Sequence, residues 1–85
     1  MQDKIIELIG DSLNELEIRV DSVVYEKEGS NNYLRIALDA DFIIDLNKVT
    51  EASRIIDPII DEADLIDEAY ILDIYAKPKG DGTNE

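Results

Sequence analysis

Cysteine and histidine are both absent from the 85-residue sequence. Without cysteine the chain has no disulfide and no thiolate metal ligand, a composition that fits a cytoplasmic protein. The absence of histidine as well excludes a zinc site and a histidine general base. No apolar run approaches the roughly 20 residues that span a bilayer. Residues 1–10 mix Asp3, Lys4 and Glu7 with isoleucines, so we expect a helix there and neither a signal peptide nor a membrane contact.

Basic residues are scarce, since eight Lys and Arg stand against 21 Asp and Glu, and the net charge is −13. A domain this acidic is repelled by phosphate backbones, so we expect no direct contact with nucleic acid. If the protein works near nucleic acid, a basic protein is the expected partner. The length allows one domain with a simple core, and 45% hydrophobic with 34% charged residues is a globular composition.

The clearest pattern in the chain is an amphipathic helix over residues 45–63. Asp45 is the expected N-cap. Pro58 removes one backbone donor and crowds the carbonyl of Arg54, so we expect a kink there or a helix restart capped by Asp57. The stripe positions recur in steps of three and four on one helical face. They are Leu46, Val49, Ser53, Ile56, Ile60 and Ala63, widened by Ala52, Ile55 and Ile59.

The other elements follow from periodicity and turn chemistry. The pattern predicts a helix over residues 2–16, a strand over 18–28 with a bulge near Asp21 and Ser22, a turn over 29–32, and strands over 33–39 and 69–76. In the connection before the long helix, Phe42, Ile43 and Ile44 are expected to cover an edge of the core. Residues 77–85 are expected to form a flexible polar tail.

The order helix, strand, strand, helix, strand predicts an α+β two-layer sandwich, in which both helices lie on one face of a small three-stranded sheet. We expect the inner face of the sheet to pack against Leu46, Val49, Ile56 and Ile60. The inner-face positions are Leu34, Ile36, Leu38, Tyr70, Leu72 and Ile74. The pattern leaves open whether the third strand lies beside the first or the second.

Four segments in this order resemble the N-terminal domain of the ribosome maturation factor RimP family. After a first helix come the hairpin SVVYEKEGSNNYLRIALD at residues 22–39, the helix DLNKVTEASRIIDPIIDEADLI at residues 45–66, and YILDI at residues 70–74. Family members carry DVEYVKEGGNWYLRVYID, TLDDCEAVSRAISALLDEEDPI and YxLEV at these places. The matching hairpin positions are Val23, Tyr25, Lys27, Glu28, Gly29, Asn31, Tyr33, Leu34, Arg35 and Asp39. The resemblance covers residues 1–76, which we take as the domain.

This resemblance implies a non-enzymatic binding module that assists assembly of the small ribosomal subunit, through contact with a basic ribosomal protein. Family members follow the third strand with SSPG and a second, barrel-like domain, whereas residues 75–80 here read YAKPKG. The alternative is an autonomous acidic protein-interaction domain that has lost the family role together with the second domain. The oligomeric state stays open at this point.

Two groups of residues are candidate contact sites. The first is an acidic run with no Lys or Arg inside it, which suits docking of a basic partner or an ordinary solvated surface. Its members are Asp57, Asp61, Glu62, Asp64, Asp67 and Glu68, and Asp73 extends it. The second group is expected on the outer face of the sheet, where bases could stack or another domain or subunit could pack. Its members are Tyr33, Arg35, Ile71 and Tyr75.

Metal binding and catalysis find little support in the sequence. Asp39 and Asp41 offer two carboxylates, but Ile43 stands where an EF-hand places its third oxygen ligand. No histidine is present to activate a hydroxyl, whether of Ser22, Thr50 or Ser53. We therefore expect no metal, no cofactor and no catalytic residue.

Overall fold

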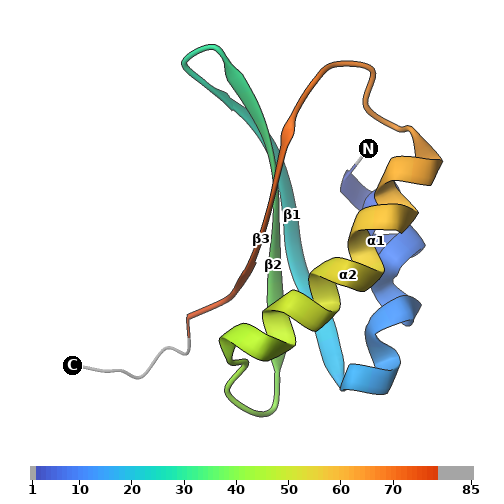
Figure 1. Cartoon of the computed structure of the whole chain (residues 1–85), viewed down its shortest axis with the longest axis vertical. Helices are drawn as coiled ribbons and strands as arrows, with labels where there is room; N and C mark the ends of the chain where they lie inside the picture. Colours follow the sequence, from blue (N-terminus) through green and yellow to red (C-terminus); the bar gives the residue numbers. More distant parts are fainter. Residues whose placement is uncertain (1, 79–85) are drawn as a thin grey trace.

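The computed structural model describes residues 2–78 of the chain. Within these residues, a three-stranded sheet carries the helices on one of its faces, and no helix or strand covers the other face (Figure 1). The elements in chain order are α1 (Gln2–Gly10), the 3₁₀ helix η1 (Asp11–Leu16), β1 (Ile18–Glu28), β2 (Asn31–Ala40), α2 (Leu46–Ala63) and β3 (Ile71–Ala76). This order and layering confirm the predicted α+β sandwich. Most of the predicted tail, residues 79–85, lies outside the described residues.

The first helix is shorter than the sequence pattern predicts. α1 ends at Gly10 and the chain continues as η1, so the expectation of one α-helix over residues 2–16 is wrong in its second half. Glycine costs a helix about 1 kcal/mol relative to alanine, and the Asp and Ser that follow compete for backbone groups. The Ser12 hydroxyl donates to the Ile9 carbonyl at 2.6 Å. The tighter 3₁₀ turn still places Leu13 in the core.

The hairpin of β1 and β2 follows the prediction closely. The pairing register shifts between Val20 and Ser22, where the bulge was predicted. Because Glu28 pairs with Asn31, the turn is shorter than the predicted 29–32, and the second half of that prediction is wrong. Gly29 has a φ of +62°, which a two-residue hairpin turn requires at its first position and which a side chain would strain.

β2 is the central strand of the sheet, which answers the question of strand order that the sequence left open. β1 pairs with it antiparallel, and β3 pairs with its other edge in parallel. A parallel neighbour needs a crossover connection, and α2 supplies it. The ladder continues beyond β3, where the Lys77 N–H donates to the Leu38 carbonyl at 2.7 Å.

α2 begins as predicted, with the Asp45 carboxylate accepting from the Lys48 N–H at 2.9 Å. The helix runs through Pro58 without interruption, so a restart at Asp57 is wrong. Pro58 lies on the exposed side of the helix, where the backbone carbonyl left without a partner can reach water. Leu46 is 80% exposed, and its predicted place in the core is also wrong. As the first residue of the helix, it lies beyond the edge of the packed face.

The core lies between β2 and the helices. Its largest fully buried side chains are Ile5, Ile9, Leu13, Leu34, Ile36, Leu38 and Ile56. Tyr70, Leu72 and Ile74 pack against them, as do Phe42 and Ile44 of the connection. Ile43 is 80% exposed, so its predicted covering role is wrong. No helix within residues 2–78 has the length and apolar character needed to cross a membrane.

Replacing Ile56 by Ala should lower the free energy of unfolding by about 2–4 kcal/mol, because a fully buried side chain leaves a cavity. The matched control is Leu46→Ala on the same helix, which should change stability by less than about 0.5 kcal/mol because Leu46 is exposed. Urea denaturation measures both variants. Equal, small losses for the two would contradict the packing of α2 on the sheet.

Candidate functional site

Six acidic side chains lie at the C-terminal end of α2 and in the loop that follows it. They are Asp57, Asp61, Glu62, Asp64, Asp67 and Glu68, all of them exposed, and we call them the acidic face. The helix ends where Asp64 adopts a left-handed conformation with φ of 52° and donates its N–H to the Ile60 carbonyl at 3.2 Å. Aspartate tolerates this conformation better than most residues, which explains an acid at the turn itself.

The acidic face occupies the end of α2 where negative charge does not help the helix. The C-terminal end of a helix carries partial negative charge, which favours cations there. The last turn of α2 nevertheless contains no base, and it holds Asp61 and Glu62. Among the described residues, none of the six acids takes part in an ion pair. Their field therefore extends into solvent, where a cationic partner can meet it.

Burial and the carboxylates of the acidic face raise the pKa values of two tyrosines, Tyr70 and Tyr25. Burial raises the pKa of Tyr70, and the carboxylates of Asp61, Asp57 and Asp64 raise it further. The charges of three acids from the last turns of α2 and its cap thus all raise the pKa of one hydroxyl. Burial also raises the pKa of Tyr25, whose hydroxyl donates to Glu68 Oε1 at 3.1 Å. This hydrogen bond ties the loop to β1.

Asp73 does not belong to the acidic face, although it extends the acidic run in the sequence. Strand pairing sets it beside Arg35, whose Nε lies 3.4 Å from Asp73 Oδ2. The run has no base inside it in the sequence, yet a base from another strand neutralises it at this one position. The neutralising arginine comes from β2, and only the pairing of β2 with β3 brings the two together.

The four residues predicted for the outer sheet face lie together in the structure. In the register of β2 with β3, Tyr33 pairs with Ile71 and Ala37 with Tyr75, on the face opposite the buried core positions. Ile71 and Tyr75 are 45% and 39% exposed. Sequence reasoning missed Val24, which is also exposed on this sheet. The bulge in β1 shifts the alternation so that Val23 is buried and Val24 is not, and the size of that shift cannot be read from composition.

Arg35 stands at the centre of the outer sheet face and is held by its neighbours. Its guanidinium carbon lies 4.6 Å from the centroid of the Tyr33 ring. Its Nη1 lies 2.8 Å from Glu28 Oε2 and 3.4 Å from Glu26 Oε2. The hydrogen bond from Arg35 lowers the pKa of Glu28 and raises the pKa of Arg35 itself. The positive charge of Arg35 is thus shared among carboxylates of the chain.

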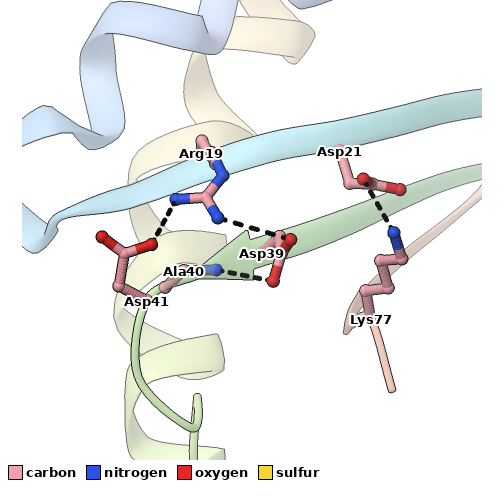
Figure 2. Close-up of polar contacts among 6 residues, drawn as sticks. All are labelled: Arg19, Asp21, Asp39, Ala40, Asp41 and Lys77. Carbon is pink, nitrogen blue, oxygen red and sulfur yellow. Dashed lines mark hydrogen bonds and ion pairs between the residues drawn. The ribbon is translucent and has the colours of Figure 1, made fainter. Parts of the chain in front are cut away.

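The end of the sheet where β1 begins and β2 ends carries a second set of ion pairs, shown in Figure 2. Arg19 reaches Asp39 at 3.5 Å and Asp41 at 3.4 Å, and the Lys77 ammonium lies 3.3 Å from Asp21. Asp39 and Asp41, the two carboxylates that the sequence offered for a metal, therefore both pair with Arg19. Within residues 2–78 no group of three or more potential ligands is placed to hold a metal ion.

The family model of the RimP N-terminal domain matches residues 8–76 of the chain. The matched segment contains the hairpin, α2 and β3, and with them the whole acidic face and the outer sheet face.

Replacing Asp57, Asp61 and Asp64 together by Asn should lower the pKa of Tyr70 toward its ordinary value, without reaching it because burial remains. The folded state holds the Tyr70 proton more tightly than the unfolded state does, so protonated Tyr70 contributes to the free energy of unfolding below about pH 10. This contribution is lost as the pH rises through the pKa of Tyr70 in the folded state. The parent should therefore lose more stability than the variant in that alkaline range. Tyrosinate absorbance during a pH titration measures the change.

The chain has four tyrosines, and a Tyr70→Phe variant identifies which transition belongs to Tyr70. The charge-matched control changes three exposed acids outside the acidic face, two in η1 and one in the first half of α2, none of which contributes to the pKa shift of Tyr70: Asp11→Asn, Glu15→Gln and Glu51→Gln. Titration curves that shift equally in the two triple variants would refute the effect of the acidic face on the pKa of Tyr70.

Proposed function

Because the chain belongs to the RimP N-terminal domain family, we propose that it serves maturation of the small ribosomal subunit by binding a basic ribosomal protein. The observation that carries this proposal is the family match over residues 8–76. The family role is that of a maturation factor, so the chain acts by association and performs no catalysis. Its place of work in this proposal is the cytoplasm.

The acidic face is the surface we assign to the partner. Its six carboxylates are exposed and stand at a helix end where they do not stabilise the helix. A ribosomal protein rich in Lys and Arg would be attracted by them and by the net charge of −13. Exposed charges of this kind chiefly accelerate association, and their effect falls with ionic strength.

The ion pairing of four of the eight bases favours a protein partner over the phosphates of RNA. Arg19, Arg35, Lys48 and Lys77 each lie within ion-pair distance of a carboxylate of the chain. A phosphate approaching any of them would also meet the paired acid. Affinity for a nucleic-acid backbone depends on cations that are free to neutralise it.

The outer sheet face is the second surface in this proposal, with Tyr33, Arg35, Ile71 and Tyr75 as its contact residues. Arg35 is engaged by carboxylates and by Tyr33, which leaves little of its charge or of the Tyr33 ring for base stacking. The exposed apolar side chains of Ile71 and Tyr75 suit packing by another domain or subunit of the assembly.

Cosedimentation with small ribosomal subunits and their precursors tests the proposal. The protein should pellet with the particles at about 0.05 M salt and remain in the supernatant at about 0.3 M, since screening shortens the reach of exposed charges. A variant with Asp61, Asp64 and Asp67 changed to Asn should pellet much less at low salt. The triple Asp11, Glu15 and Glu51 variant has the same net charge and should behave as the parent.

Stopped-flow mixing with a purified basic ribosomal protein measures the association and dissociation rates separately. The acidic-face variant should associate more slowly, with a smaller change in dissociation, as expected when rim charges are removed. If the protein stays in the supernatant at low salt, a direct ribosomal role for this chain fails. If both triple variants lose binding equally, net charge and not the acidic face accounts for it.

A further inference from the structure

Two shallow hollows open beside the acidic face, and Leu65 forms part of both. The first, of about 380 Å³, is lined by Lys4, Glu7, Leu8, Ala63 and Leu65. The second, of about 450 Å³, is lined by Tyr25, Leu65, Ile66, Asp67 and Glu68. We call the two together the Leu65 groove. Each volume lies in the range of sites that accept whole ligands, about 300–1,000 Å³, so each has room for a large side chain.

The groove exists because α1 and α2 run antiparallel, so that the beginning of α1 lies beside the end of α2 (Figure 1). α1 turns Ile5 and Ile9 into the core, and Leu8 between them projects to the side and is 41% exposed. The loop after α2 then places Leu65 and Ile66 in the same hollow as Tyr25 of β1. An apolar floor therefore stays open at the molecular surface.

The rim of the groove has the opposite character. Glu7 lines one hollow, and Asp67 and Glu68 line the other, against the single base Lys4. The other carboxylates of the acidic face lie on the last turns of α2 and at its C-cap, next in sequence to Ala63 and Leu65 of the groove. An apolar floor with a negative rim is complementary to a segment that carries apolar side chains flanked by cations. A second copy of this chain, with its net charge of −13, would be repelled.

We propose that the Leu65 groove receives the apolar anchor side chains of a cationic amphipathic segment of the partner protein, whose lysines and arginines contact the acidic face. This inference rests on the proposed function in one respect, the docking of a basic protein at the acidic face. It adds that the charges steer the encounter while the buried apolar anchors set the lifetime and the selectivity of the complex. Leu8 and Leu65 are the specificity-determining residues.

Two fluorescent synthetic peptides of equal charge test the inference. One carries Leu at helical spacing among Lys residues, and in the other every Leu is replaced by Ser. At low salt the parent should bind the Leu/Lys peptide at least about tenfold more tightly than the Ser/Lys peptide, the factor expected for burying one leucine side chain. Fluorescence anisotropy measures both affinities. Amide shifts in NMR spectra should be centred on Leu8, Ala63 and Leu65.

The variant Leu8→Ser should remove most of this preference, and Leu46→Ser is the matched control, since Leu46 is exposed at the other end of α2. Circular dichroism verifies that both remain folded. If Leu8→Ser unfolds the protein, the amide shifts of the parent decide the question. Equal binding of the two peptides, weakened by salt, would overturn the groove and leave the acidic face intact. A preference for the Leu/Lys peptide that does not depend on salt would support apolar binding in the Leu65 groove and overturn electrostatic docking at the acidic face. If neither peptide binds, both proposals are overturned.

Discussion

The pairing of β2 on both edges is the constraint on which the rest of the structure depends. Leu34, Ile36 and Leu38 are fully buried, so they set which face of the sheet meets the helices. Their alternate neighbours, Tyr33 and Arg35, are thereby placed on the outer face. A slip of one residue would exchange the two sets and bury a guanidinium, which is why this register is strongly specified.

Local chemistry was enough to predict much of this fold, because period-2 alternation, the Asp45 cap and the bulge in β1 all depend on residues close in sequence. The misses have physical causes of another kind. Gly10 weakens α1 locally. Leu46 fits the helical period, but it lies at the end of α2, where the period does not show whether the sheet still reaches the side chain. The neutralisation of Asp73 arises from the parallel pairing of β2 with β3, which the sequence left undecided.

The two ends of the sheet are built on opposite principles. At one end Arg19 and Lys77 form ion pairs with nearby carboxylates, so these charges neutralise one another within the chain. At the other end the six carboxylates of the acidic face have no ion-pair partner among the described residues, and they lie near the exposed Leu8 and the half-buried Leu65. The acids at the C-terminal end of α2 oppose the local rule of helix stability, which is a pattern expected where a surface serves binding.

The parallel position of β3 has a consequence for how the chain folds and opens. The β1–β2 hairpin forms from neighbouring residues, whereas β3 can pair only after α2 has carried the chain across the sheet. β3 is short, lies at an edge and has no fully buried side chain. Its amides and those of the loop before it are expected to exchange with solvent through local opening, well below the cost of global unfolding. The segment next to the acidic face is therefore the part of the fold that can rearrange first when a partner arrives.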